Sequence, residues 1–348
     1  MNQDYNFEDY LQRVLSNSIS SQNPSKKAKD RARKLSSGYY EDLKEKLLIS
    51  YENKSLKDVF DCKVCSSSFG DVLRITKKEK IDFSIENNDF KHQMNCNLKL
   101  LPKIGIKTEE NLKNRGYSTI ESLKSHDKYG DVATRFLDRL DGMSYLEVVE
   151  LLDDNRYSRK CRDNVIKSIS MTDVENFKFM DIETMGLSNV PIILIGVAEI
   201  KEKNIVCSQY FLRNYTEESS IIEAYLTHLD EDSVHVTFNG KTFDVPFIKN
   251  RCIYNRIDAN LDLAHLDLMY FAKNLWSDDL PNCKLQTIER EMFGLERQGD
   301  VPGQYIPGYY KSYLENDNIG PVVPIIEHNA QDVISLANFL DKMYRDVN

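Results

Sequence analysis

Three apolar segments that favour β-strands follow one another between residues 177 and 212, at 177–181, 192–200 and 205–212. Two segments with helical spacing then alternate with two further short strands. These later segments are a helix at 219–229, a strand at 234–238, a helix at 245–254 and a strand at 264–268. This succession predicts an α/β domain built on a mixed five-stranded sheet flanked by helices.

Two carboxylates one residue apart, Asp181 and Glu183, lie at the end of the first strand. Side chains alternate along a strand, so both carboxylates point to one face, about 7 Å apart along the chain. Adjacent anions repel each other unless a cation lies between them, and the hard ions Mg²⁺ and Mn²⁺ prefer carboxylate oxygen. Taken alone, the pair is more simply two exposed acids at a strand end. The metal interpretation therefore depends on further carboxylates.

A third carboxylate, Asp244, follows the strand at 234–238 and opens the next helix. On its own it is typical of a helix N-cap. The connecting turn carries Asn239 and Lys241, and an aromatic residue, Phe243, directly precedes the carboxylate. Capping alone does not explain why an aromatic residue stands there, so we interpret this turn as part of a site.

The fourth carboxylate, Asp332, lies four residues after His328 in a segment whose apolar positions repeat at helical spacing. Residues four apart share one face of a helix, and a His and an Asp in that relation are usually only a surface pair. Here they complete a set of four carboxylates and one titratable imidazole, all near the ends of elements. Such a set indicates a metal-dependent active site.

Three motifs made of these residues resemble those of the DEDD exonucleases in order and separation. They are Asp181-x-Glu183, Asn239-x-x-x-Phe243-Asp244 and His328-x-x-x-Asp332. The resemblance covers residues 173–348 and implies a ribonuclease-H-like fold. The segments at 265–268, 280–285 and 300–310 are most similar to the YprB-like branch of predicted ribonuclease-H-like exonucleases, and the N-terminal part is similar to the accessory region of that branch.

The resemblance implies that four carboxylates hold two divalent ions, Mg²⁺ or Mn²⁺: Asp181, Glu183, Asp244 and Asp332. One ion would activate water and the other would stabilise the leaving 3′ oxygen. The expected nucleic-acid contacts in the same motifs are Thr184, Asn239, Lys241 and Phe243. His328 would orient or deprotonate the water. The spacing of four residues between His328 and Asp332 is that of the Tyr-type branch of the DEDD exonucleases, not that of the His-type branch. The identity of the water-activating residue is therefore left open. His265 is either a rival for that role or a structural histidine.

Residues 100–123 predict a short helix, a glycine-containing turn, a second helix and a glycine stop. This pattern resembles a helix-hairpin-helix element. The resemblance implies that backbone N–H groups around Gly105, Lys107 and Thr108 contact a nucleic-acid phosphate, as helix N-termini and backbone nests do with anions. A purely structural helical hairpin is the alternative.

The remaining N-terminal segments give weaker signals. An amphipathic helix is expected at 5–19, and the basic run at 26–34 is either a phosphate-contacting surface or a solvated helix start. One pair of close cysteines could join a histidine and a third cysteine as a structural Zn²⁺ site, although unconnected thiols are the favoured interpretation. The four residues of that set are Cys62, Cys65, His92 and Cys96.

Length and composition set the outer bounds. A chain of 348 residues has room for two domains, and 41% apolar residues suffice for a buried core. The expected division is a helical region with the basic run at 1–58, a small β-rich segment at 59–97, the hairpin-containing helical region at 98–171, and the exonuclease domain at 173–348. Seven cysteines, a polar start and no long apolar run predict reduced thiols and a cytoplasmic protein.

These observations and the resemblance favour a metal-dependent 3′–5′ exonuclease that hydrolyses phosphodiester bonds of single-stranded DNA or of the ends of damaged duplex. The hairpin element favours DNA, and the choice between DNA and RNA stays open. A net charge of −9 argues against a protein that binds nucleic acid by charge alone, but not against an enzyme with a local basic groove. Two alternatives remain: a non-catalytic nucleic-acid-binding protein that retains the fold, and a proofreading-type subunit of a polymerase assembly. Protein partners are not readable from the sequence.

Overall fold

The computed structural model of the protein describes residues 26–85, 90–153, 162–297 and 299–348. Its residues group into two units, one of residues 1–60 and 299–328, the other of residues 61–298 and 329–348. The expected helix at 5–19 lies outside the described residues. The basic run at 26–34 falls at the start of helix α2 (Lys26–Ser50), but its side chains are also outside the described set.

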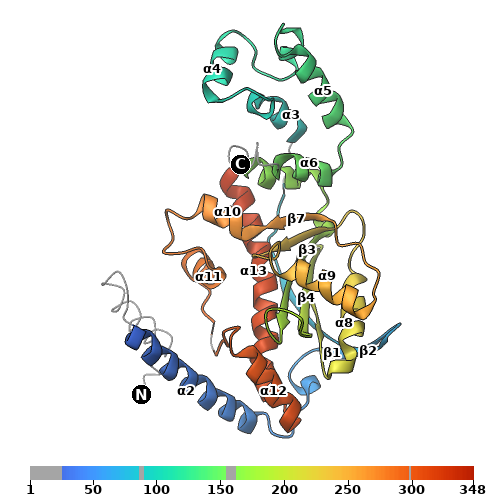
Figure 1. Ribbon diagram of the computed structural model, residues 1–348, viewed down its shortest axis with the longest axis vertical. Coiled ribbons are helices and arrows are strands. Elements are labelled where there is room, and N and C mark those ends of the chain that lie inside the picture. Colours follow the sequence, from blue (N-terminus) through green and yellow to red (C-terminus); the bar gives the residue numbers. More distant parts are fainter. Residues whose placement is uncertain (1–25, 86–89, 154–161, 298) are drawn as a thin grey trace. The chain divides into compact units, whose positions relative to one another are not determined.

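A seven-stranded sheet forms the centre of the second unit (Figure 1). Its strands are β1 (Cys62–Ser67), β2 (Gly70–Lys80), β3 (Phe177–Thr184), β4 (Ile192–Lys201), β5 (Asn204–Phe211), β6 (Val234–Thr237) and β7 (Ala264–Asp267). They lie in the order β1-β2-β5-β4-β3-β6-β7. The pairs β3·β6 and β6·β7 are parallel and the others antiparallel, so the ribonuclease-H-like α/β class expected from the sequence is confirmed.

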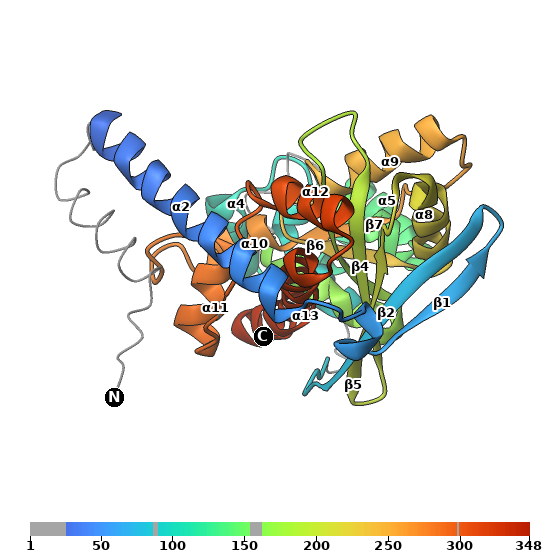
Figure 2. The same ribbon diagram turned by 90° about the horizontal axis from the view of Figure 1, so that it is seen from below.

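The sheet has two more strands than the five expected, because the β1–β2 hairpin pairs with the outer side of β5 (Figure 2). In β2, Val72, Leu73 and Ile75 are buried, while most residues of β1 are half-buried or exposed. This hairpin precedes β5 by more than a hundred residues in the chain. Local apolar patterns identify strands but do not say which distant strand they join, so the pairing was missed.

Helices cover both faces of the sheet (Figure 1). On one face lie α8 (Glu218–Leu226) and α9 (Asp244–Asn255), where Tyr225 donates a hydrogen bond to Met180 Sδ at 3.2 Å. On the other, apolar residues of α13 (Val323–Val347), such as Val333 and Leu340, share one core with Phe179. Because side chains alternate along β3, Asp181 and Glu183 belong to the α13 face.

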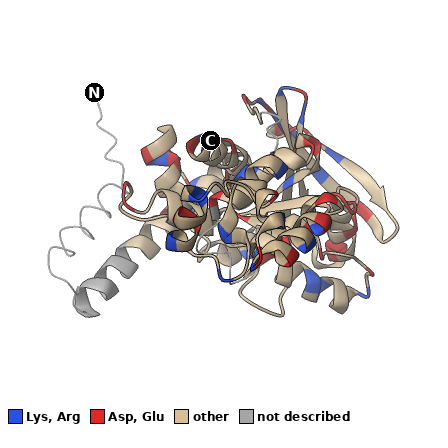
Figure 3. Ribbon diagram, turned by 90° about the horizontal axis from the view of Figure 1, so that it is seen from above, with Lys and Arg blue, Asp and Glu red and all other residues tan. Residues whose placement is uncertain are grey.

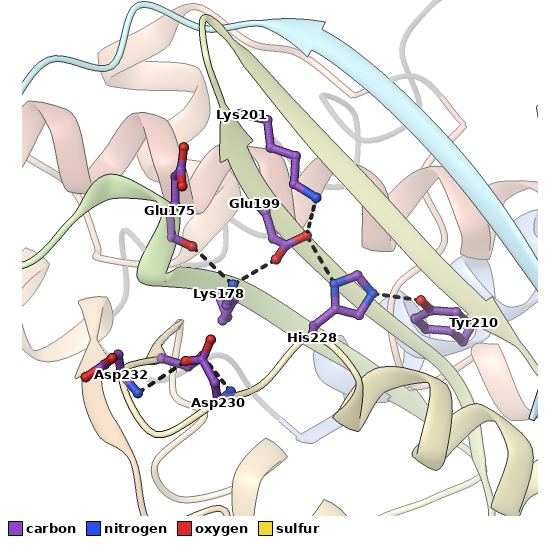
Figure 4. Close-up of polar contacts among 9 residues, drawn as sticks. Glu175, Lys178, Glu199, Lys201, Tyr210, His228, Asp230 and Asp232 are labelled. Atoms are coloured by element: carbon purple, nitrogen blue, oxygen red, sulfur yellow. Dashed lines mark hydrogen bonds and ion pairs between the residues drawn. The ribbon is translucent and has the colours of Figure 1, made fainter. Parts of the chain in front are cut away.

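A cluster of charged residues fixes the beginning of β3 (Figure 4). The Glu199 carboxylate on β4 accepts from Lys178 Nζ at 2.7 Å and pairs with Lys201 Nζ at 3.0 Å and with His228 Nδ1 at 3.2 Å. His228 Nε2 in turn lies 2.7 Å from the Tyr210 hydroxyl. Burial opposes ionisation of Glu199, but the hydrogen bonds from His228, Lys178 and Lys201 hold its pKa below the usual range. The cluster joins β3, β4, β5 and the end of α8.

The other helices of the second unit belong mainly to its N-terminal half. They are α3 (Phe90–Asn95), η2 (Leu98–Leu100), α4 (Ile106–Asn114), η3 (Ser122–Ser125), α5 (Gly130–Asp141), α6 (Tyr145–Asp153), α7 (Arg162–Lys167) and η4 (Ser168–Met171), with η5 (Val174–Asn176), η6 (Tyr215–Glu217), α10 (Leu268–Leu275) and α11 (Leu285–Phe293) following later in the chain. The expected second helix of the hairpin is α4, and its Leu112 is buried. Gly116 has φ +92°, which suits a glycine stop.

The first unit combines segments from both ends of the chain. Helix α2 packs with α12 (Ile306–Asn316) and η7 (Gly320–Val322), and η1 (Leu56–Asp58) follows α2. The Tyr309 hydroxyl donates to the Tyr40 carbonyl at 2.6 Å, and the Tyr40 and Tyr305 ring centroids are 4.4 Å apart. These tyrosines therefore hold helices together.

Three general features complete the description of the fold. Basic and acidic positions are interspersed along the ribbon (Figure 3). Within the described ranges no helix is long and apolar enough to cross a membrane. The six described cysteines are free thiols.

Candidate active site

Asp181 and Glu183 lie on the part of β3 that extends beyond its parallel neighbour. Pairing with β6 covers only residues 177–179 of β3, whereas pairing with β4 continues to Thr184 and is interrupted by a bulge between Glu183 and Thr184. Both carboxylates are half-buried. The early end of β6 leaves one side of the end of β3 available to side chains from later elements.

The Asp181 side chain is held by Asn329, a fully buried residue of α13. Asn329 Nδ2 donates to Asp181 Oδ2 at 2.9 Å and to its carbonyl at 3.1 Å, and Gln209 Nε2 donates to Asn329 Oδ1 at 2.8 Å. Asp181, Gly196 and Gln209 stand opposite one another on β3, β4 and β5. Asn329 thus spans the middle strand and orients the carboxylate.

Gly196 makes this arrangement possible. A Cβ there would lie 3.0 Å from Asn329 Cγ and 3.0 Å from Val333 Cγ2, and closer still to Asn329 Oδ1. A glycine inside an apolar strand often marks a close approach of another part of the chain. That signal was present in the sequence and was missed, as were Asn329 and Gln209.

Asp244 is the most buried of the four candidate carboxylates, with 5% of its surface exposed. It does not cap α9, because Phe243 occupies the N-cap position and Asp244 is the first helical residue. Its Oδ1 instead accepts from the N–H of Ile182, at 3.1 Å. Ile182 stands between Asp181 and Glu183, so this hydrogen bond brings the third carboxylate to the first two.

The charge state of Asp244 reflects that setting. Burial raises its pKa to about 7, although hydrogen bonds from the N–H groups of Ile182 and Asp244 itself act in the opposite direction. The negative charges of Asp267 and Asp332 raise the pKa further. Negative charge is therefore concentrated around a carboxylate with little access to water.

Asp332 on α13 pairs with Arg297, whose Nη2 lies 2.5 Å from Asp332 Oδ1. The same guanidinium donates two hydrogen bonds of 2.7 Å to the two oxygens of Glu289, a fully buried residue of α11. Neither Glu289 nor Arg297 belongs to a motif noticed in the sequence. Glu289 lies within α11 and Arg297 follows that helix, and only the fold brings them to the last candidate carboxylate.

His328 contacts Asp300, with its Nδ1 hydrogen-bonded to Asp300 Oδ1. An ionised carboxylate can only accept, so Nδ1 carries the proton of this hydrogen bond. Both residues belong to the first unit, whereas the four carboxylates belong to the second. The water-activating role of His328 thus stays a prediction. In the sequence, Asp300 was noted only as part of the segment at 300–310, which is similar to the YprB-like branch.

His265 is engaged inside the sheet. Its Nε2 lies 2.8 Å from the Thr237 hydroxyl, and its ring contacts that of His235 at 5.6 Å between centroids. Burial first, and then the neighbouring positive charges of His235, Lys241 and Lys249, hold its pKa far below the ordinary value. These contacts favour the structural interpretation of His265 over its role as the base.

The turn between β6 and α9 is organised by Asp267, another residue that the sequence did not reveal. Its carboxylate accepts from the N–H groups of Asn239 at 2.7 Å and Lys241 at 3.1 Å. Asn239 is exposed with φ +72°, and Phe243 packs on Phe247 at 5.5 Å between centroids. The expected contact residues of this turn are therefore presented on a fixed backbone.

The other expected contact residues occupy separate places. The Thr184 hydroxyl donates to the Gly186 carbonyl at 2.6 Å, next to the candidate carboxylates. Gly105 stands at the N-cap position of α4, Lys107 is exposed and Thr108 is half-buried.

The proposed zinc ligands are not gathered into a site. Cys62 and Cys65 are three apart on β1 and so point to opposite faces, while Cys96 Sγ lies 3.8 Å from His92 Nε2. Across the described residues, no three His, Cys, Asp or Glu side chains are already arranged as ligands of one metal ion.

The candidate carboxylates nevertheless fit a hard divalent cation by their chemistry. All their donor atoms are carboxylate oxygens, the ligands that Mg²⁺ and Mn²⁺ prefer. They come from β3, α9 and α13, and Asp244 is held against β3 by the Ile182 N–H. The raised pKa of Asp244 indicates negative charge that a divalent cation would offset.

Comparison with known proteins agrees with the fold. Residues 178–344 match a family model described as RNase_H superfamily. The chain is also similar to the "Uncharacterized protein YprB" of Bacillus subtilis (strain 168), with 30% identity over 177 residues. That similarity covers 49% of this chain and 43% of the relative, so the chain spans less than half of the relative's length.

The strand order and the family match together define a ribonuclease-H-like fold. The match to this superfamily suggests nuclease-type chemistry and nucleic-acid binding. Nucleases of the superfamily generally use divalent metal ions. The matched segment begins at Lys178 and ends at Tyr344, and all four candidate carboxylates fall inside it.

Proposed function

We propose that the protein is a 3′–5′ exonuclease that hydrolyses phosphodiester bonds of nucleic acid, with single-stranded DNA as the preferred substrate. The observation that carries the proposal is the hydrogen bond from Ile182 N–H to Asp244, because it joins the Asp181–Glu183 pair to a buried carboxylate from another element. Asp332 completes the set, and its negative charge raises the pKa of Asp244.

Asp181, Glu183, Asp244 and Asp332 would hold two divalent ions, Mg²⁺ or Mn²⁺. Bound there, the ions would supply charge stabilisation for the displaced 3′ oxygen and a more acidic water. The chain's own contribution is to fix the carboxylates: Asn329 holds Asp181, and the β3 backbone holds Asp244. Because the ligands are already in position, the site does not have to rearrange during catalysis.

His328 would orient the attacking water or accept its proton. Its Nδ1 donates to Asp300, which fixes the ring and makes Nε2 the nitrogen that can exchange a proton. The neutral form suits this work near neutral pH. Replacing His328 should therefore lower turnover and leave metal binding intact, whereas loss of any one carboxylate should remove nearly all activity.

Two groups of residues would contact the nucleic acid. Thr184 follows Glu183 at the end of β3. Asn239, Lys241 and Phe243 belong to the turn that precedes Asp244, and Asp267 holds that turn. Gly105, Lys107 and Thr108 begin α4 and offer backbone N–H groups to a phosphate. The preference for DNA rests on this second group.

The experiment is degradation of 3′-labelled and 5′-labelled single-stranded DNA and RNA in Mn²⁺, Mg²⁺ or EDTA, with the wild type beside Asp181→Ala. Stepwise shortening from the 3′ end that needs metal and Asp181 is the expected result. Faster loss of DNA than of RNA would support the substrate preference. Binding without cleavage of either polymer, in all metals, would replace the proposal with a non-catalytic nucleic-acid-binding protein.

A further inference from the structure

A buried pair of charged residues, Glu289 and Arg297, contacts the candidate site through Asp332. The Glu289 side chain is 1% exposed and that of Arg297 is 11% exposed. Two parallel hydrogen bonds of 2.7 Å join them in the fork arrangement that a guanidinium makes with a carboxylate. A pair buried in this way needs its remaining polar atoms satisfied.

Both partners also contact α13. Glu289 Oε1 also accepts from the hydroxyl of Ser335, and Gln331 Nε2 donates to that hydroxyl at 3.0 Å. Arg297 places Nη2 2.5 Å from Asp332 Oδ1. Asp332 and Ser335 are three residues apart and so lie on one side of α13. The pair therefore contacts α13 at two neighbouring residues, Ser335 and Asp332, and Asp332 is a candidate metal ligand.

We infer that Arg297, anchored by Glu289, is a positioning residue that fixes the Asp332 carboxylate for a divalent cation. This inference rests on the proposed function, because it takes Asp332 as a metal ligand. The guanidinium is held by two hydrogen bonds to the buried Glu289 carboxylate, so it is a fixed positive charge beside Asp332 Oδ1. This ion pair holds one oxygen of the Asp332 carboxylate before the cation binds.

The same contacts argue against a mobile role for Arg297. An arginine that swings onto a substrate phosphate would have to leave Glu289 buried without its two donors, which costs several kcal/mol. Partners that orient metal ligands typically change metal affinity by about 10–100-fold when they are removed. The effect should therefore appear first in metal binding rather than in the affinity for nucleic acid.

The test is Mn²⁺ binding to the full chain without substrate, followed by the EPR signal of free Mn²⁺. We expect Arg297→Met and Glu289→Gln each to raise the dissociation constant about 10–100-fold. Arg297→Lys should recover part of the affinity, because lysine keeps the charge but cannot make the fork. The double variant should bind Mn²⁺ no more weakly than the single variant with the higher dissociation constant, since the two residues act as one unit.

The matched control is Arg290→Met. Arg290 lies on α11, the same helix as Glu289, and its side chain is 39% exposed in a surface pair with Glu291. It should bind Mn²⁺ as the wild type does. As a second readout, the Mn²⁺ concentration that half-activates the Arg297 variants should rise while KM for the oligonucleotide stays constant, which a general loss of packing would not produce.

The variant Asp332→Asn distinguishes an error in the positioning role of Arg297 from an error in the proposed metal site. If Asp332→Asn loses Mn²⁺ binding while Arg297→Met and Glu289→Gln bind as the wild type or more tightly, the positioning role is wrong and the proposed function stands. If Asp332→Asn itself binds Mn²⁺ normally, the proposed metal site is wrong. Circular dichroism establishes folding, and if Arg297→Met does not fold, Arg297→Lys and Glu289→Gln decide the question.

Discussion

A single glycine determines how closely α13 approaches the sheet at the candidate site. Gly196 faces Asp181 on the neighbouring strand, and its missing side chain leaves the space that Asn329 occupies. Asn329 then donates to Asp181 and accepts from Gln209. The orientation of one carboxylate thus depends on a residue that has no side chain at all.

Gly196→Ala should therefore harm both stability and metal binding. The added methyl group has no space, because Asn329 and Val333 stand against it, and overpacking of this kind costs about 1–3 kcal/mol. Displacing Asn329 also releases Asp181, so Mn²⁺ should bind more weakly. Chemical denaturation and Mn²⁺ titration measure the two effects. Gly142→Ala, where a Cβ would meet nothing within 4 Å, should change neither.

The buried His235 should make stability depend on pH. Burial first, and then the charge of Lys249, lower the pKa of His235 to about 4, while an unfolded histidine has a pKa near 6.5. The unfolded chain therefore takes up the proton first as the pH falls. The stabilisation is complete above pH 6.5 and is lost between pH 6.5 and about 4.

Over that interval His235 alone should remove roughly 3 kcal/mol from the free energy of unfolding, at about 1.4 kcal/mol per pH unit for one proton. Urea unfolding of the wild type and of His235→Leu, measured between pH 7 and pH 4, tests this. The variant should show a shallower dependence. An unchanged slope in His235→Leu would show that other groups cause it, and His92→Leu should keep the wild-type slope.

At the scale of elements, the Lys178–Glu199–His228 cluster anchors β3 at the end opposite its carboxylates. Removing one partner of a buried ion pair leaves a charge without compensation. Lys178→Met should accordingly lower the free energy of unfolding by about 2–4 kcal/mol. The control is Lys77→Met in the exposed pair with Glu79, which should cost less than about 1 kcal/mol. Equal losses in denaturant unfolding would contradict this account of the cluster.

The elements themselves could largely be predicted from sequence, because β3 to β7 are runs of apolar residues with polar boundaries. The β1–β2 hairpin was recognised as β-rich but not as part of the sheet, since its pairing with β5 is a long-range contact. The same limit applies to the candidate site. Motifs pointed to the candidate carboxylates, but the contacts of Asn329 and Arg297 with them depend on the fold and leave no local pattern.

At the scale of the whole molecule, the two units interleave along the chain, because residues 299–328 belong with residues 1–60. Helix α13 begins in one unit and ends in the other, and the candidate base and the candidate carboxylates are assigned to different units. The sequence indicated one continuous domain from residue 173 to the end. Where the chain changes unit depends on packing such as that of Tyr309 on Tyr40.

Metal binding should raise the stability of the folded chain as a whole. A ligand that binds only the folded state adds about 2.7 kcal/mol at a concentration one hundred times its dissociation constant. Mn²⁺ should therefore raise the Tm of the wild type, and Asp244→Asn should lose most of that increase. Na⁺ at equal ionic strength distinguishes specific binding from screening. A rise of equal size in Asp244→Asn would place the ion elsewhere.

The central claim, that carboxylates from β3, α9 and α13 bind divalent cations together, is tested most directly by anomalous diffraction from crystals grown with Mn²⁺. The account predicts manganese peaks within ligand distance, about 2.0–2.3 Å, of oxygens from Asp181, Glu183, Asp244 and Asp332. Two peaks roughly 4 Å apart would support the two-ion arrangement. A map without manganese at these carboxylates, from crystals in which Mn²⁺ is saturating, would contradict the claim.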